Sequence, residues 1–220
     1  MPPHRWLAPV LRLFFRFLYN EFAWTYDCVA WAVSLGRWRR WVSASLPYLA
    51  GPRVLELGHG PGHLLNALAQ RGIPVIGVDS SRRMSSQAAR RLRKQFAAGA
   101  LPGGPPALVC AKAPDLPFAA SSFDQVVATF PSEYIFLPVT LLEINRLLRA
   151  GGSLIVLPYA WITSHRWLDR LAAGLFRATG QAPDWDKRVL IPFTRAGFNA
   201  VAQAVDLEGS QVMLIVAKKP

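Results

Sequence analysis

Short apolar runs alternate with helical spacings along the middle of this chain. Leu64, Leu65 and Leu68 recur at the intervals of a helix, and residues 82–98 form a second, arginine-rich helical segment with a solvated outer face. Apolar runs that predict buried strands occupy residues 54–57, 74–79 and 108–111. Strands and helices that follow one another in this way predict an α/β fold.

The last third of the chain carries further patterns of both kinds. We expect a helix over residues 138–149, with Arg149 in its last turn and Gly151-Gly152 as its stop. We expect another helix over residues 194–204. A terminal antiparallel hairpin is predicted from the apolar runs 205–207 and 212–217, which flank Glu208-Gly209.

The beginning of the chain is distinct from the rest. We expect residues 1–50 to form an N-terminal helical extension or cap, and residues 51–220 to form one globular domain. Arg5, Arg12 and Arg16 fall on one face of the first predicted helix. A following helix carries a stripe of tryptophans, which we interpret as core packing: Trp31, Trp38 and Trp41.

A glycine-rich turn lies between the first strand and its helix. The sequence Gly58-His59-Gly60-Pro61-Gly62 allows a sharp turn and a close approach of a ligand to the backbone. The helix that follows points unpaired N–H groups and its positive end toward the turn, as in sites for nucleotide-type ligands. The dinucleotide fingerprint requires a glycine at its sixth position, where this chain has His63.

The pattern is instead an acid followed by three alternating glycines, with Glu56 in the lead. It resembles the class I S-adenosylmethionine-dependent methyltransferases. A second apolar run ends in Asp79, near the spacing of roughly 20 residues expected of a ribose-binding acid. Asp79 also suits the N-cap of the next helix, and the two roles are compatible.

Three later segments strengthen the resemblance. Residues 122–130 resemble the fourth strand of the family, and residues 147–156 resemble its helix–Gly-Gly–strand segment. Residues 112–118 resemble the segment whose acid contacts the adenine amino group, but Lys112 occupies the acid's position. A lysine cannot accept a hydrogen bond from an amine, so backbone groups near Ala113 or the Asp115 carboxylate would have to replace it.

The resemblance implies a Rossmann-like, seven-stranded sheet that is mostly parallel, with an antiparallel last strand and helices on both faces. The implied cofactor is S-adenosylmethionine, with S-adenosylhomocysteine as product. The residues that the resemblance assigns to the cofactor are Glu56, Gly58, Gly60, Gly62, Asp79, Ser80, Met84, Ala113, Thr129 and Phe130.

The resemblance also implies the transfer of a methyl group to a small acceptor, which we expect to be apolar or lipid-like. A hydroxyl or acidic-carbon acceptor would benefit from a general base, whereas an amine or thiolate would need none. Candidates for the base are Glu133, Tyr26 and His165. The aromatic segment 159–190 is either one wall of an acceptor pocket or additional core.

Composition narrows the class of protein. The 220 residues are 52% hydrophobic and 17% charged, which is typical of a globular chain rather than a disordered one. The net charge of +12 predicts attraction to an anionic partner. Cys28 and Cys110 lack metal-type spacing, so we interpret both as small buried hydrophobes, expect no metal site and expect a cytoplasmic location.

Two alternatives remain at this point. The basic charge would suit a methyltransferase of RNA or DNA, although residues 130–133 lack the Asn-Pro-Pro-Tyr pattern of base-modifying enzymes. Lys112 would suit a non-catalytic protein that retained the fold.

The first helix either lies on an anionic membrane surface, which would place the protein on the inner face of the membrane, or caps the pocket. No apolar segment is long enough for a transmembrane span, and no obligate protein partner is inferred.

Overall fold

The computed structural model describes residues 34–163 and 187–220. Tyr26, His165 and Cys28 lie outside this range, as do the first predicted helix and most of the segment 159–190. Two expected base candidates are therefore not placed by the structure. No helix in the described part is long and apolar enough to cross a membrane.

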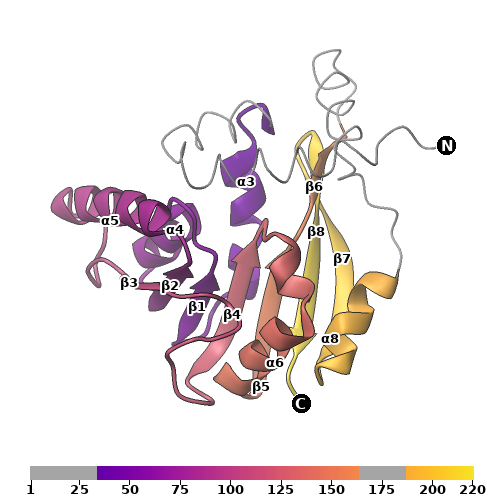
Figure 1. Ribbon diagram of the computed structural model, residues 1–220. Coiled ribbons are helices and arrows are strands. Elements are labelled where there is room, and N and C mark those ends of the chain that lie inside the picture. Colours follow the sequence, from indigo (N-terminus) through magenta and orange to yellow (C-terminus); the bar gives the residue numbers. More distant parts are fainter. Residues whose placement is uncertain (1–33, 164–186) are drawn as a thin grey trace.

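One mixed sheet forms the centre of the molecule (Figure 1). Its order is β3-β2-β1-β4-β5-β8-β6, and β7 pairs with β8 outside this path. The strands are β1 Val54–Leu57, β2 Val75–Asp79, β3 Ala107–Cys110, β4 Phe123–Thr129, β5 Leu148–Leu157, β6 Ala160–Ile162, β7 Asn199–Leu207 and β8 Ser210–Lys218. Strands β1 to β5 pair in parallel, whereas β8 is antiparallel to both β5 and β7. The predicted mostly parallel sheet with an antiparallel last strand is confirmed.

The sheet contains eight strands rather than the expected seven, and β6 is the difference. Residues Ser153 to Val156 of β5 pair with the end of β8, and Ala160 to Ile162 pair with its beginning. Both strands therefore lie along the same neighbour. Pro158 lies between them and has no N–H to donate to a ladder, which fits an interruption at this point. The arrangement is a seven-position sheet with one divided strand.

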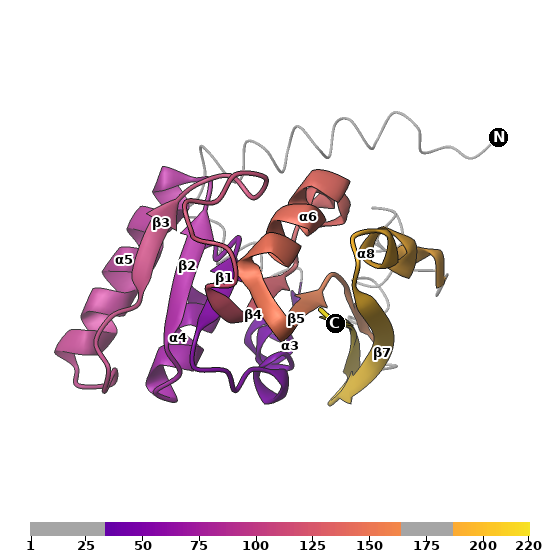
Figure 2. The ribbon, with the colours of Figure 1, turned by 90° about the horizontal axis from the view of Figure 1, so that it is seen from below.

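The two faces of the sheet bury two hydrophobic clusters, because successive strand residues point to opposite sides. Val127 and Ile155 pack in the cluster beneath α3, α4 and α5, whereas Val126 and Val156 pack in the cluster beneath α6 and α8. Figure 2 shows these helices on the two sides of the strands. The helices are α3 Trp38–Ser43, α4 His63–Gln70, α5 Arg82–Ala97, α6 Pro138–Leu147 and α8 Ile191–Arg195, and the 3₁₀ turns are η2 Leu46–Tyr48, η3 Glu133–Phe136 and η4 Lys187–Leu190.

The expected helix over 194–204 is wrong. Helix α8 ends at Arg195, Gly197 adopts a left-handed conformation with φ of 87°, and β7 begins at Asn199. The side chains of β7 alternate in burial, and all nine residues pair with β8. Gly197 as a helix stop, followed by alternation, was the signal that the helical interpretation overlooked.

Two other expectations need correction. Helix α6 ends at Leu147, so Arg149 lies in β5 rather than in a helical turn. There its guanidinium pairs with the Asp124 carboxylate at 2.5 Å, and Arg53 pairs with the same carboxylate at 3.2 Å. Cys110 is exposed at the end of β3 rather than buried, and its thiol lies 3.7 Å from the Ser80 carbonyl oxygen.

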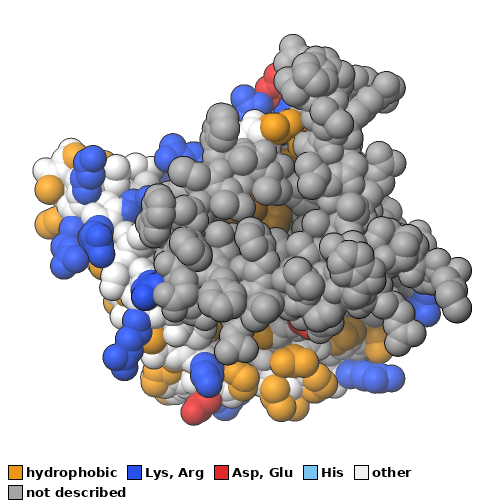
Figure 3. All heavy atoms as spheres, turned by 45° about the horizontal axis from the view of Figure 1, so that its top comes forward, with side chains coloured by type: hydrophobic (Ala, Val, Ile, Leu, Met, Phe, Trp, Pro, Cys, Tyr) orange, Lys and Arg blue, Asp and Glu red, His pale blue; other side chains and the backbone are white. Residues whose placement is uncertain are grey.

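The arginine-rich segment forms the exposed face of α5, as expected, while Met84, Ala88 and Leu92 bury its other side. Figure 3 shows Lys and Arg side chains around the end of the molecule where α5 lies, with few acidic ones near them. Among the described residues, no group of three or more His, Cys, Asp or Glu side chains could hold a metal ion.

Candidate functional site

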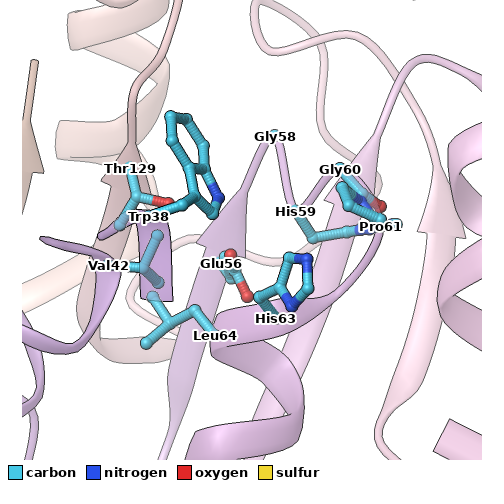
Figure 4. A pocket seen from close by; sticks show the side chains of 10 residues that line it. All are labelled: Trp38, Val42, Glu56, Gly58, His59, Gly60, Pro61, His63, Leu64 and Thr129. Atoms are coloured by element: carbon cyan, nitrogen blue, oxygen red, sulfur yellow. Dashed lines mark hydrogen bonds between the residues drawn. The ribbon is translucent and has the colours of Figure 1, made fainter. Parts of the chain in front are cut away.

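A pocket lies at the carboxyl ends of β1 and β4, where α3 crosses the sheet (Figure 4). Residues of the segment 56–64 form one side of it. Trp38 and Val42 of α3 and Thr129 of β4 form the other side. The carboxyl ends of parallel strands are the usual ligand site of open α/β sheets, so the fold places the pocket where a ligand is expected.

Backbone hydrogen bonds hold the start of the glycine turn. The N–H groups of Gly58 and His59 both donate to the Val78 carbonyl, at 2.7 and 3.2 Å. Gly58, Gly60 and Gly62 all have positive φ angles, of 73°, 52° and 80°, in the region that favours glycine. A Cβ on Gly62 would lie 2.9 Å from Ala88 Cβ, whereas a Cβ on Gly60 would meet no described atom within 4 Å. No described atom therefore fills the space beside the Gly60 Cα.

Asp79 connects the end of β2 to this turn. One carboxylate oxygen accepts the Gly60 N–H at 2.9 Å, and the other accepts the Ser81 N–H at 2.8 Å. The N-cap of α5 is Ser81, whose hydroxyl accepts the Met84 N–H, so the suggested capping role of Asp79 is wrong. Asp79 instead orients the glycine turn from the neighbouring strand.

Glu56 is a buried carboxyl group at the base of the pocket. It is 1% exposed, and Glu56 Oε2 has no hydrogen-bond partner within the described residues. Burial raises the pKa of Glu56 well above its ordinary value; a backbone hydrogen bond from Leu65 opposes this shift and the nearby Asp79 charge adds to it. A buried carboxylate oxygen without a partner is costly, and a cation in the pocket would remove that cost.

His59 fills the space beneath the turn. Its Nδ1 lies 2.7 Å from the Gly60 carbonyl oxygen, and its ring packs against Gly77, where an added Cβ would lie 3.0 Å from the imidazole. Desolvation lowers the pKa of His59, although the Asp79 charge and the backbone carbonyls oppose this shift. The imidazole is therefore a neutral, buried support for the turn.

The opposite side of the pocket is aromatic. The Trp38 indole stacks on the Phe130 ring with centroids 4.3 Å apart. Phe130 follows β4 with a φ of 48°, unusual for a non-glycine residue. Trp41 lies behind both rings, 1% exposed, and its indole N–H donates to Ser210 Oγ at 2.9 Å. Core packing is thus confirmed for Trp41, whereas Trp38 lines the pocket.

The structure brings some predicted site residues together and separates others. Glu56, Gly58, Gly60 and Thr129 line one pocket, with Asp79 and Phe130 directly behind its two sides. The remaining described members lie outside the pocket lining: Gly62 precedes α4, Met84 is fully buried in α5, Ser80 and Glu133 are exposed, Ala113 packs beside the core, and Lys112 is exposed.

The sequence interpretation missed Trp38, Val42 and His59 as pocket residues. His59 stands inside the glycine motif but at a position for which the motif specifies no residue type. Trp38 belongs to a stripe whose spacing is equally typical of a core helix. Its partners on the aromatic side, Thr129 and Phe130, lie far away in the sequence, so no local pattern connects them.

Comparison with known proteins agrees with this geometry. Residues 55–156 match the family described as "Methyltransferase domain". The chain is 33% identical over 147 residues to a demethylmenaquinone methyltransferase of Beutenbergia cavernae, covering 65% of this chain and 57% of the relative. It is 32% identical over 124 residues to an uncharacterized methyltransferase of Mycobacterium marinum. The chain thus spans a little over half the length of the first of these relatives.

A solved structure shows the same fold over nearly the whole chain. The magnesium protoporphyrin IX methyltransferase of Synechocystis PCC 6803, solved with bound SAH, superimposes with a TM-score of 0.65 at 18% identity. The match covers 95% of this chain and 100% of the other. Residues 55–156 thus match the methyltransferase family, and the chain has the fold of the S-adenosylmethionine-dependent methyltransferases. The resemblance in the glycine motif and its later segments is thereby confirmed.

The residues of the pocket fit the cofactor of this family. The buried Glu56 oxygen without a partner suits the ammonium group of S-adenosylmethionine, because a buried charge needs an opposite charge beside it. The unfilled space beside the Gly60 Cα suits a ligand that approaches the turn closely. The pocket lining lies between these two features, so one ligand can use both.

Proposed function

We propose that this chain transfers the methyl group of S-adenosylmethionine to a small acceptor that is apolar or lipid-like. One observation carries the proposal: the same pocket contains the glycine turn, which Asp79 holds in place, and the Glu56 carboxyl oxygen that has no hydrogen-bond partner among the described residues. A turn alone could be structural. A turn combined with a buried, unsatisfied carboxyl group indicates a cationic ligand.

The cofactor supplies an activated methyl group, so the chain's own residues have to position the two reactants and shield them from water. In this proposal Glu56 binds the ammonium end, the Gly58–Gly62 backbone lies along the methionine portion, and Asp79 fixes the turn and meets the ribose. Thr129 and Trp38 lie on the opposite side of the pocket. They would exclude water there and orient the acceptor toward the sulfur.

The acceptor class rests on two supports. The relative at 33% identity is named for methylation of demethylmenaquinone, and the pocket side opposite the glycine turn is apolar and aromatic. Glu133 remains a candidate base for a hydroxyl or acidic-carbon acceptor. Burial raises the pKa of the Tyr159 hydroxyl, and the Glu133 charge adds to this shift. Tyr26 and His165 remain candidates from the sequence alone.

The test is calorimetric binding of S-adenosylmethionine to the full chain and to Asp79→Ala. We expect micromolar binding by the wild type and at least a tenfold loss in Asp79→Ala, because Gly60 and Ser81 both lose the acceptor of their N–H groups. Glu208→Ala is the matched control, since this acid is exposed, pairs with Arg40 on the surface and does not line the pocket. Binding of a nicotinamide cofactor, with no response to S-adenosylmethionine or S-adenosylhomocysteine, would contradict the proposal.

We also propose that the full chain attaches peripherally to anionic membrane surfaces. The sequence places Arg5, Arg12 and Arg16 on one face of an apolar helix, and each basic residue near such a surface adds about 1 kcal/mol of attraction. Exposed apolar side chains of the α6 region, Leu137, Val139 and Leu142, would add contact area. Flotation with anionic and neutral vesicles tests this proposal; binding that persists unchanged without residues 1–18 would refute the role of the first helix.

A further inference from the structure

The described lining of the pocket differs in composition from the chain as a whole. The chain has a net charge of +12, yet none of the described residues that line the pocket is Lys or Arg. The acidic group there is Glu56, and His59 is held neutral by burial. The Arg91 guanidinium donates to the Pro61 carbonyl at the edge of the pocket, so a positively charged ligand would be attracted mainly by the Glu56 carboxyl group and by aromatic rings.

Trp38 provides a second feature suited to a cation. Figure 4 shows its indole on the side of the pocket formed with Thr129 and Val42, across from Gly58 and above Glu56. The negative potential of an aromatic face attracts a positive charge, and tryptophan does so most strongly. Stacking on Phe130 fixes the indole against that ring, which itself follows directly after Thr129.

We propose that Trp38 is a specificity-determining residue that distinguishes the positively charged sulfonium of S-adenosylmethionine from the neutral sulfide of its product. The inference rests on the proposed function and deepens it. Glu56 cannot make this distinction, because the ammonium group that suits it is present in both compounds. An aromatic face beside the sulfur can, because cation–π attraction requires the charge.

The charge at sulfur changes in the reaction itself. In methyl transfer the sulfur–carbon bond breaks, its electron pair stays on sulfur, and a bond forms between the methyl carbon and the acceptor atom. Sulfur thereby becomes neutral. A thiolate acceptor becomes a neutral thioether, a tertiary amine keeps the positive charge, and any other neutral acceptor loses a proton to a base or to water. Attraction by Trp38 ends at this step, which favours exchange of product for fresh cofactor.

The experiment measures affinities for both compounds by calorimetry, using the full chain and two variants. We expect Trp38→Leu to lower the affinity for S-adenosylmethionine about tenfold, since the ring is half-buried and its cation–π contact should lie between the exposed and the desolvated values. The same variant should change the affinity for S-adenosylhomocysteine by less than about twofold. Trp38→Phe retains an aromatic face and should recover most of the lost discrimination.

Val42→Ala is the matched control. It alters the same side of the pocket without removing an aromatic ring, so it should change both affinities by the same factor. Thermal unfolding of each variant separates altered binding from loss of the fold. A Trp38→Leu protein that stays folded and loses affinity for both compounds by the same factor would overturn the inference while leaving the proposed function intact. A wild-type chain that binds neither compound would overturn both.

Discussion

The two sides of the pocket are built in different ways. The glycine side comes from one continuous stretch, residues 56–64, and is held by backbone hydrogen bonds and the Asp79 carboxylate. The aromatic side comes from α3 and the end of β4, which are distant in sequence, and is held by ring packing between Trp38 and Phe130. The first side is a local structure and the second is a product of tertiary assembly.

This difference separates two tasks. A turn of glycines in a fixed conformation tolerates few substitutions, so it suits the part of the pocket that meets an invariant ligand. Side-chain packing can change by single substitutions without disturbing the turn, so it suits the part of the pocket that faces a variable acceptor. We therefore expect changes on the glycine side to affect folding or cofactor binding, and changes on the aromatic side to affect selectivity.

The largest expected effect is on the glycine side. Gly62→Ala adds a Cβ 2.9 Å from Ala88 Cβ and 3.3 Å from Ala88 Cα, at a φ of 80°. Helix α5 would have to move, and strain and overpacking together should lower the free energy of unfolding by about 3 kcal/mol. Urea denaturation followed by circular dichroism measures this loss.

Gly60→Ala is the partner experiment. Its φ is also positive, but its added Cβ meets no described atom within 4 Å. It should therefore cost only about 1 kcal/mol of stability, from the strained backbone alone. If ligand occupies the open space at Gly60, this variant should lose more cofactor affinity than stability. Equal stability losses in the two variants would contradict the assignment of Gly62 to packing and Gly60 to binding.

The sequence predicted the glycine side well because its information is local. The strand before the turn, the helix after it and the position of Asp79 all follow from a short motif and its flanking apolar runs. On the aromatic side the resemblance supplied Thr129 and Phe130. Trp38 and Val42 could not be predicted, since the stacking of Trp38 on Phe130 depends on how α3 crosses the sheet. The sequence also misassigned residues 194–204, where pairing with β8 determines the strand.

The second prediction concerns Glu56 and its dependence on pH. The folded state raises the pKa of Glu56, so its stabilising contribution is complete below the ordinary pKa of a glutamic acid, about 4.3, and is lost as pH rises through the folded value. Glu56→Gln cannot ionise, so its stability does not fall with pH in this way. The variant should be more stable than the wild type by about 1–2 kcal/mol at pH 8 and should show little difference at pH 4.

Stability and binding should change in opposite directions in this variant. Glu56→Gln should bind S-adenosylmethionine roughly tenfold more weakly, because the ammonium group loses its opposite charge. Denaturation series at pH 4, 6 and 8, together with calorimetry at pH 8, measure both quantities. A difference in stability between Glu56→Gln and the wild type that does not widen with pH would mean that the Glu56 pKa is not raised by burial. The reason to expect a cation on the glycine side would then be lost.

The smallest expected effect concerns Lys112, at the position where the family resemblance expects an acid. Lys112 is exposed, and its carbonyl accepts the Asp115 N–H at 3.0 Å, so the side chain can be changed without breaking this turn. Lys112→Asp restores a hydrogen-bond acceptor for the adenine amino group and should tighten cofactor binding by about 1 kcal/mol. Lys112→Met removes the charge without adding an acceptor and should leave affinity nearly unchanged. If both variants bind the cofactor with equal affinity, groups other than residue 112 hold the adenine. The cofactor contacts would then not extend from the glycine side to the segment that follows β3.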